Sequence, residues 1–272
     1  RLLVGTTDEE VSPDAELVVT AEDVDYLLRH LNQYVARPIT PGDVVSGFAG
    51  ARPLVGSDSS TDTKKLARDD VIEVDPASGL ISIMGGKWTT HRAMAEDTIH
   101  TAQQALGLSQ TESKTRHHIL SGGEGFTDDY WKRLCREHQI SEGTARHLAG
   151  KFGTASQKVL ELTIDNPDLL QTILPGGRAI RAEVVYAVRY EMAATIEDVL
   201  ARRLGMQFYS WSDCLDAAPI VGPLMRRELQ WSDPSTREAI TNYIEKIYHL
   251  VETAGLPREG YASSRSEQSA AD

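Results

Sequence analysis

Short apolar runs separated by polar turns dominate the first third of the chain. Residues 2–4 and 44–48 carry apolar runs that predict strands. Between them a helix is expected to begin at Thr20, because a threonine followed by acidic residues favours a helix start and the apolar residues beyond it recur at helical spacing. Residues 56–65 are rich in Ser, Thr and Asp, which indicates a surface loop.

Two further apolar runs, at residues 71–74 and 80–84, predict a β-hairpin or meander. The second run leads through Gly85 and Gly86 directly into a helical pattern that begins near Thr89. A strand, a glycine pair and a helix start therefore follow one another without an intervening loop.

Beyond a polar, glycine-rich stretch at residues 107–125 the strand signals nearly vanish, which makes this stretch the best domain boundary. The clearest helical pattern carries an apolar stripe from Val184 to Leu200. The tail from Gly255 is dominated by polar and small residues and is expected to be disordered. Helices are predicted over residues 128–138, 141–151, 154–163, 181–203, 213–229 and 235–253.

Composition narrows the class of protein. The 272 residues, 40% of them hydrophobic, suffice for one large domain or two ordinary ones. A formal net charge of -12 argues against nucleic acid as a partner, because binding to a phosphate backbone relies on a basic face. Cys135 and Cys214 are too few for a disulfide framework, which favours a reducing compartment.

The sequence also bears on location. No apolar run approaches the roughly 18 residues that span a bilayer, and the chain begins inside an expected strand rather than with a signal. We therefore expect a fragment of a cytoplasmic protein. Peripheral attachment to the cytoplasmic or inner membrane face stays open.

The junction at Gly85 and Gly86 is the first candidate for chemistry. A helix start presents unpaired backbone N–H groups and a positive dipole end, which favour an anion or a polarised carbonyl. Glycine has no Cβ, so a flat ring or a phosphate can approach the backbone closely. From these residues alone an ordinary structural turn is the commoner interpretation, because a fold-level feature seldom implies function.

Several cations flank this junction in the sequence. Arg52 precedes a proline, which favours an extended backbone, and a guanidinium held there can contact a phosphate or carboxylate through two nitrogens. Without other information, Arg52 and Arg68 would be read as solvated surface charges, and Lys87 adds little. No metal is expected, because the candidate histidines have no carboxylate or cysteine at ligand spacing: His91, His117 and His118.

Three segments, residues 47–54, 67–72 and 79–99, resemble in order and spacing the motifs of the FAD-dependent, respiratory and quinone-linked glycerol-3-phosphate dehydrogenases. His91 stands where this family usually has Tyr. A G-x-G-x-x-G fingerprint is absent, although the family carries it near its N-terminus. The chain thus resembles the C-terminal portion of the family. Further segments that resemble it are residues 4–8, 26–34, 180–190, 198–203 and 226–231.

The resemblance implies an α+β fold in two parts. Residues 1–112 would be the C-terminal part of an FAD-dependent oxidoreductase domain that holds flavin and substrate. Residues 113–254 would be an all-helical C-terminal domain, and residues 255–272 a disordered tail. No chemistry is evident in the helical domain, and structural cover is the favoured role, because exposed charged faces are most often solvated.

The resemblance also implies an activity and a site. The family oxidises sn-glycerol 3-phosphate to dihydroxyacetone phosphate by hydride transfer to FAD and passes the electrons to quinone. Arg52, Arg68 and Lys87 would bind substrate, with Arg52 and Lys87 as the catalytic pair; a fragment without the nucleotide-binding half would be inactive alone. The expected FAD-binding residues are Gly85, Gly86, Lys87, Trp88, Thr89 and Thr90.

Two alternatives stay open from the sequence. The same fold could pass electrons to oxygen, as a glycerol-3-phosphate oxidase, or the chain could be a non-catalytic helical interaction module. Besides substrate and quinone, a homodimer and a peripheral membrane contact are potential partners. The general base cannot be chosen from this segment.

Overall fold

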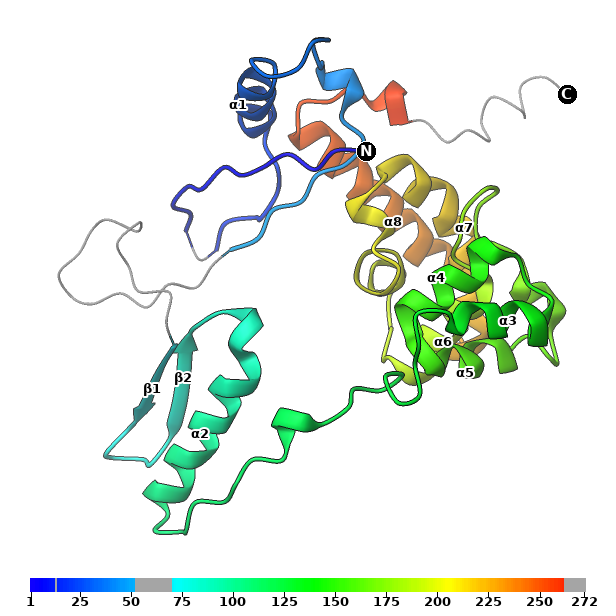
Figure 1. Ribbon diagram of the computed structural model, residues 1–272. Helices are drawn as coiled ribbons and strands as arrows, with labels where there is room; N and C mark the ends of the chain where they lie inside the picture. The colour runs from blue at the N-terminus through cyan, green and yellow to red at the C-terminus, as the bar shows by residue number, and fades with distance from the viewer. Residues whose placement is uncertain (13, 52–69, 262–272) are drawn as a thin grey trace, which may run out of the picture. The chain divides into compact units, whose positions relative to one another are not determined.

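The computed structural model describes residues 1–12, 14–51 and 70–261. The chain divides into two compact units, which are described separately (Figure 1). The helical unit comprises residues 1–8, 16–49 and 120–272, and the hairpin unit comprises residues 9–15 and 50–119. Packing thus groups residues 16–49 with the helices, whereas the sequence grouped them with the hairpin. The domain limits at 112 and 254 stay a prediction.

The hairpin unit contains the predicted β-hairpin. Strands β1 (Asp70–Val74) and β2 (Ile81–Gly85) pair antiparallel, with Asp70 opposite Gly85 and Val74 opposite Ile81. Helix α2 (His91–Ala105) contacts both strands (Figure 1). The turn is fastened by Asp75, whose carboxylate accepts the amides of Ala77 at 2.6 Å and Ser78 at 3.2 Å.

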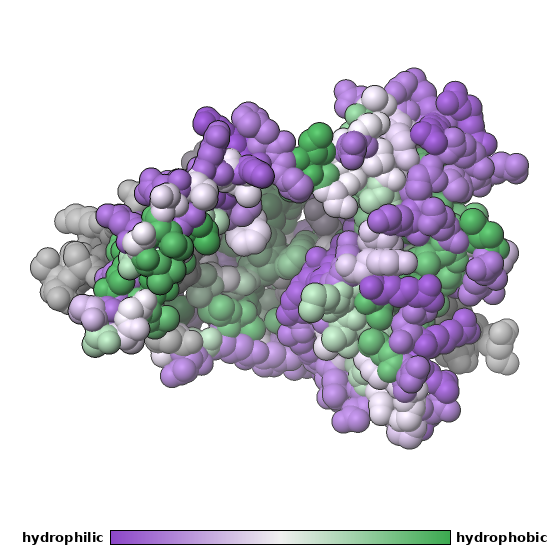
Figure 2. All heavy atoms as spheres, turned by 90° about the horizontal axis from the view of Figure 1, so that it is seen from below, coloured by the Kyte–Doolittle hydropathy of each residue, from purple (hydrophilic) through white to green (hydrophobic). Residues whose placement is uncertain are grey.

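This unit has no closed hydrophobic core among the described residues. None of the residues of β1, β2 or α2 is buried. Figure 2 shows apolar side chains at the molecular surface. In the hairpin unit, Leu80 is 64% exposed and Ile99 is 57% exposed. The hairpin and α2 together therefore bury too little apolar surface to form a core of their own.

Helix α1 (Ala21–Leu31) begins where the sequence predicts. Thr20 Oγ1 accepts the amide of Asp23 at 3.2 Å, and the Asp23 carboxylate accepts the amide of Thr20 at 3.0 Å. This reciprocal pair is a capping box, which satisfies two amides at the helix start. The strands expected at 2–4 and 44–48 do not form among the described residues. A strand needs a neighbouring ladder, and the carbonyl of Val45 instead accepts the amide of Trp211.

Beyond residue 120, the described residues of the helical unit form α3 (Tyr130–His138), α4 (Glu142–Phe152), α5 (Ser156–Glu161), α6 (Arg181–Tyr190), α7 (Trp211–Leu229) and α8 (Asp233–Thr253). These residues enclose two hydrophobic cores. One lies around α7 and α8 and includes Trp211 and Ile247, and the other lies among α3 to α6 and includes Leu134 and Leu148. Leu224 of α7 packs against both cores. The predicted α+β fold class with an all-helical C-terminal domain is confirmed.

The single helix predicted over residues 181–203 was wrong. Helix α6 ends at Tyr190, Met192 has a positive φ of 58°, and a π-helix spans Asp198–Arg203. The apolar stripe continues across the break because both pieces turn apolar residues, such as Val184 and Val199, toward the same core. Continuous periodicity therefore hid an interruption of the backbone.

The chain stays packed beyond the expected start of the tail. Leu256 and Tyr261 are buried, and residues Arg258–Tyr261 form a 3-10 turn. The Tyr261 hydroxyl donates a hydrogen bond to the carbonyl of Val44. Two apolar anchors thus hold residues 255–261 on the helical unit. None of the helices in the described residues combines the length and apolar character needed to cross a membrane.

Candidate functional site

The turn from β2 to α2 depends on glycine at its second position. Gly85 and Gly86 have φ angles of 71° and 83°, in the left-handed region that favours glycine. A Cβ placed on Gly86 would lie 2.5 Å from Met94 Cε and 3.1 Å from Asp70 Cβ. The flexible end of Met94 could move aside, but the crowding by Asp70 and the positive φ together favour glycine at position 86.

The residues after the glycines form a tight helix start. The amide and the Oγ1 hydroxyl of Thr90 both donate to the carbonyl of Lys87, at 3.0 Å and 2.9 Å. The 3-10 turn Trp88–Thr90 then continues into α2 at His91. The amides of Trp88 and Thr89 have no partner among the described residues. The helix start thus presents free N–H donors at its positive end.

An exposed aromatic pair covers one side of this start. Trp88 is 87% exposed. Its ring stacks on the ring of His91, with the two ring centroids 5.4 Å apart. Nδ1 of His91 lies 2.9 Å from the Trp88 carbonyl. A carbonyl only accepts, so Nδ1 carries the proton in this contact. His91, the residue that departs from the family pattern, therefore holds Trp88 in place.

Two cations lie at the helix start, and only one of them forms an ion pair among the described residues. Arg92 forms an ion pair with Glu96 at 2.6 Å. The hydrogen bond from Arg92 holds the pKa of the Glu96 carboxyl below its usual range. Lys87 is exposed and has no ion-pair partner among the described residues. Its ammonium is consequently available to an anion, whereas the charge of Arg92 is largely matched.

The structure places part of the predicted site. It brings the six expected FAD-binding residues into one turn, and their role in binding stays a prediction. Arg52 and Arg68 lie outside the described residues, so their placement beside Lys87 also stays a prediction. The six residues are Gly85, Gly86, Lys87, Trp88, Thr89 and Thr90.

A buried charged cluster in the helical unit was not predicted from the sequence. The Glu183 side chain is fully buried and accepts hydrogen bonds from the amide of Ile180 at 2.9 Å, from His147 Nε2 at 3.0 Å and from Lys151 Nζ at 2.9 Å. Burial raises the pKa of the Glu183 carboxyl, but the hydrogen bond from His147 and the charge of Lys151 outweigh burial and leave the pKa below its usual value.

This cluster joins α4 to the first turn of α6. His147 and Lys151 are four residues apart on α4, so both face the same carboxylate. That spacing, and a glutamate at the third position of α6, were signals in the sequence. Because its partners and a helix amide occupy both carboxylate oxygens, Glu183 has a structural task rather than a catalytic one.

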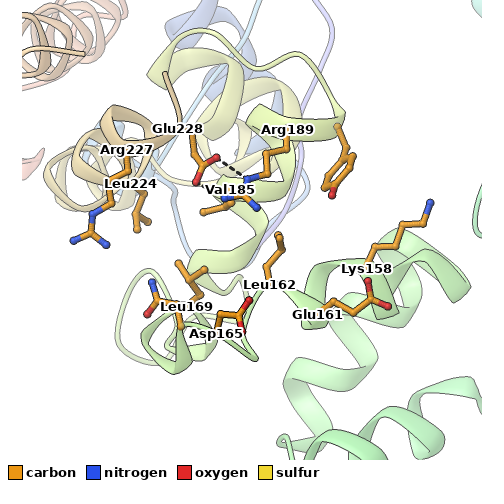
Figure 3. A pocket seen from close by; sticks show the side chains of 12 residues that line it. Lys158, Glu161, Leu162, Asp165, Leu169, Val185, Arg189, Leu224, Arg227 and Glu228 are labelled. Atoms are coloured by element: carbon orange, nitrogen blue, oxygen red, sulfur yellow. Dashed lines mark hydrogen bonds and ion pairs between the residues drawn. The ribbon is translucent and has the colours of Figure 1, made fainter. Parts of the chain in front are cut away.

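A cavity of about 250 Å³ lies among α5, α6 and α7 (Figure 3). The Arg189 guanidinium binds both oxygens of Glu228, at 2.6 Å and 2.9 Å, above an apolar floor that includes Val185 and Leu169. The charged residues of its wall are Lys158, Glu161, Asp165, Arg189, Arg227 and Glu228. The three positive charges match the three negative ones, so the cavity favours neither anions nor cations.

Known proteins resemble this chain over most of its length. Residues 113–236 match the family described as the C-terminal domain of alpha-glycerophosphate oxidase. Mitochondrial glycerol-3-phosphate dehydrogenase of Bos taurus is 32% identical over 98% of this chain and 36% of its own length. Glycerol-3-phosphate dehydrogenase 2 of Mycobacterium bovis is 32% identical over 90% of this chain and 42% of its own length.

A solved structure of a related protein has a similar fold. The glycerol-3-phosphate dehydrogenase from Bacillus halodurans, complexed with FAD, superposes with a TM-score of 0.68 and 27% identity over 91% of this chain and 47% of that chain. Residues 113–236 thus form the helical C-terminal domain of a class of oxidoreductases. Residues 113–236 carry the C-terminal domain of the glycerol-3-phosphate oxidase and dehydrogenase family, and the chain is similar to glycerol-3-phosphate dehydrogenases over nearly its whole length. It spans less than half the length of these relatives.

Proposed function

We propose that this chain is the part of a flavoenzyme that contributes substrate-binding cations and a flavin contact to the oxidation of sn-glycerol 3-phosphate to dihydroxyacetone phosphate. The electrons would pass through FAD to a quinone. The observation that carries the proposal is the exposed helix start after Gly86, where the amides of Trp88 and Thr89 and the ammonium of Lys87 have no partner among the described residues. The names of the relatives and the FAD complex of the Bacillus halodurans protein support the same activity.

The residues present are compatible with a flavin. Bound FAD supplies the hydride acceptor, and the protein supplies orientation and charge. The candidate contacts are the backbone at Gly85 and Gly86 and the first turn from Trp88 to Thr90. A helix end contributes typically about 0.3 to 1 kcal/mol to the binding of a negative charge. That contribution is small, so Lys87 is needed to add a directed positive charge.

Substrate binding requires cations close to the phosphate. The net charge of -12 opposes a dianion only weakly, because screening limits such interactions to about 8 Å at physiological salt. Arg52, Arg68 and Lys87 are the proposed substrate-binding residues. Arg52 and Lys87 are proposed to lie nearest the reacting groups, where Arg52 can bind a phosphate through two nitrogens.

The function is tested on the full-length protein. Purified protein should show flavin absorbance and should reduce an artificial dye when sn-glycerol 3-phosphate is added. Arg52→Ala should raise KM for the substrate or abolish turnover. A full-length protein without flavin, or without substrate-dependent dye reduction, would remove the proposed function, and an unchanged rate in Arg52→Ala would remove only the site assignment.

The second candidate function is a glycerol-3-phosphate oxidase. It is favoured by the match of residues 113–236 to a domain named for alpha-glycerophosphate oxidase. Formation of one hydrogen peroxide per substrate consumed, without added acceptor, would support the oxidase. Reduction of a quinone analogue without peroxide would support the dehydrogenase.

We also propose a peripheral membrane location and a homodimer as the context of the quinone-linked enzyme. A quinone is dissolved in the bilayer, so its reductase has to reach the membrane surface. Co-sedimentation of the full-length protein with vesicles and its mass in solution test these two proposals independently of activity.

A further inference from the structure

The two amides at the start of α2 that have no partner among the described residues point in directions set by their own peptide planes. The amide of Trp88 shares a plane with the carbonyl of Lys87, and the amide of Thr89 shares a plane with the carbonyl of Trp88. Both peptide bonds are trans, so in each plane the N–H points opposite to the C=O. A hydrogen bond that holds either carbonyl therefore also fixes the direction of the amide beside it.

Each of these carbonyls accepts a side-chain donor as well as a backbone amide. The Lys87 carbonyl accepts the amide of Thr90 at 3.0 Å and the Oγ1 hydroxyl of Thr90 at 2.9 Å. The Trp88 carbonyl accepts the amide of His91 and also Nδ1 of the His91 ring, which lies 2.9 Å away. The side chains of Thr90 and His91 thus hold the two peptide planes that carry the unpartnered amides.

These two side chains have little other structural work. Thr90 and His91 are both exposed, and neither belongs to a hydrophobic core of the described residues. A hydrogen bond at the surface replaces one to water, so it stabilises the fold little. What the two side-chain bonds mainly determine is the orientation of the peptide planes. All the residues involved are consecutive and lie in the hairpin unit, so one unit sets this geometry.

Fixed donors stabilise a negative charge better than mobile ones, because no free energy is spent on orienting them when the charge develops. A flavin ring becomes more negative when it accepts a hydride. We infer that Thr90 and His91 are positioning residues that hold the two amides toward the flavin, an inference that rests on the proposed function. The fixed amides favour the reduced flavin over the oxidised one and so raise its reduction potential.

The test measures the midpoint potential of the flavin in the full-length, FAD-containing protein, by equilibration with a reference dye. His91→Phe keeps an aromatic ring beside Trp88 and removes the Nδ1 donor. The ratio of reduced to oxidised flavin at a given potential should fall about threefold to tenfold, the factor for one lost hydrogen bond. For a two-electron couple this lowers the potential by about 15 to 30 mV.

Thr90→Val, which removes the other side-chain donor, should lower the potential in the same direction. Thr90→Ser keeps the hydroxyl and should restore the wild-type potential. His91→Asn places an amide nitrogen near the position of Nδ1 without a ring, so it too should keep the wild-type potential. A lowered potential in His91→Asn together with an unchanged one in His91→Phe would assign the effect to ring stacking and overturn the inference.

His100→Phe is the matched control on the same helix. Nε2 of His100 lies 3.2 Å from the carbonyl of Thr111, so this variant removes a histidine contact to a carbonyl away from the helix start. It should leave the potential unchanged. A purely structural role for His91 predicts a lower melting temperature or FAD content with the wild-type potential in the flavin that remains, and that result would overturn the inference. A full-length protein that binds no flavin would instead overturn the proposed function itself.

Discussion

At the scale of single residues, Lys87 carries the sharpest functional prediction. Its ammonium is exposed at a positive helix start and has no ion-pair partner among the described residues. In the full-length protein, Lys87→Ala should lower kcat/KM for sn-glycerol 3-phosphate by about 100-fold, the loss typical of removing one directed charge from a reacting centre. Steady-state dye reduction measures this change.

Lys114→Ala is the control for Lys87→Ala. Lys114 is an exposed lysine of the same hairpin unit, so its removal changes the net charge equally. It should leave kcat/KM within about twofold of the wild type, because the exposed charge of Lys114 lies outside the turn of the proposed site and is screened by solvent and salt. Equal effects of the two substitutions would show that Lys87 acts only through net charge.

A second residue-scale prediction concerns Gly122. Its φ is 84°, and a Cβ there would lie 2.1 Å from the carbonyl oxygen of Phe152. The amide of Thr154 also donates to the Gly122 carbonyl at 2.8 Å, so the two backbones cannot separate without losing that bond. Gly122→Ala should lower the free energy of unfolding by about 3 kcal/mol, as measured by denaturant unfolding.

Gly125→Ala separates crowding from backbone conformation. Gly125 has a similar positive φ of 69°, but nothing lies within 4 Å of a Cβ placed there. This variant should lose only about 1 kcal/mol, the cost of a left-handed backbone for an alanine. If both variants lost the same stability, the close approach of Gly122 to Phe152 would not be the cause.

At the scale of elements, Glu183 fastens α4 to the start of α6. Glu183→Gln removes the buried carboxylate and leaves the ammonium of Lys151 and the ring of His147 without their anion. Their side chains are 24% and 23% exposed, so water can partly solvate them. The expected loss is therefore about 3 kcal/mol, the lower end for a broken buried pair. Thermal or denaturant unfolding of the chain measures it.

The control is Glu142→Gln, at the exposed start of the same helix. Glu142 pairs with Arg146 at 2.7 Å, and its side chain is 61% exposed. Exposed pairs contribute about 0 to 1 kcal/mol. A loss in Glu142→Gln as large as that in Glu183→Gln would contradict the claim that burial makes the difference.

The same cluster gives a pH dependence with a defined sign. In the folded chain the pKa of Glu183 lies below the ordinary glutamate value of 4.5, so the unfolded chain binds this proton more tightly. Its contribution to stability is present above pH 4.5 and is lost as the pH falls through the folded-state pKa. The stability difference between wild type and Glu183→Gln should therefore shrink below pH 4.5. A difference that grew on acidification would contradict this sign.

Local chemistry explains which elements the sequence predicted correctly. The Thr20 and Asp23 pair correctly predicted the start of α1, and the glycine pair correctly predicted the junction of β2 and α2. The same Thr-x-x-Asp pattern occurs at Thr195 and Asp198, where the two residues form a reciprocal cap with distances of 3.0 Å. The apolar stripe alone predicted a single helix over residues 181–203, because the stripe continues past this cap.

Contacts distant in sequence could not be predicted. Ser46 and Gln207 are separated by 161 positions, and no spacing or composition links them. The turn of the candidate site was predictable because its six residues are consecutive. The cluster at Glu183 was predictable only in part. His147 and Lys151 share a helix face, which the sequence indicates, but the carboxylate that they bind is more than thirty positions away in the sequence.

At the scale of the whole molecule, buried apolar contacts are unevenly distributed. Both hydrophobic cores lie in the helical unit, whereas β1, β2 and α2 contain no buried residue. Local unfolding requires less free energy where few apolar contacts are broken. The hairpin unit should therefore open more often than the helical unit in this 272-residue chain.

Limited proteolysis measures that difference. With a protease of broad specificity at low concentration, cleavage between residues 70 and 119 should precede cleavage between residues 130 and 253, as read by mass spectrometry of the fragments. Glu183→Gln should accelerate cleavage in the helical unit without changing that in the hairpin unit, because the cluster lies in the helical unit alone. Early cleavage within α7 or α8 of the wild type would contradict this distribution of stability, since the core around Trp211 and Ile247 has to open first.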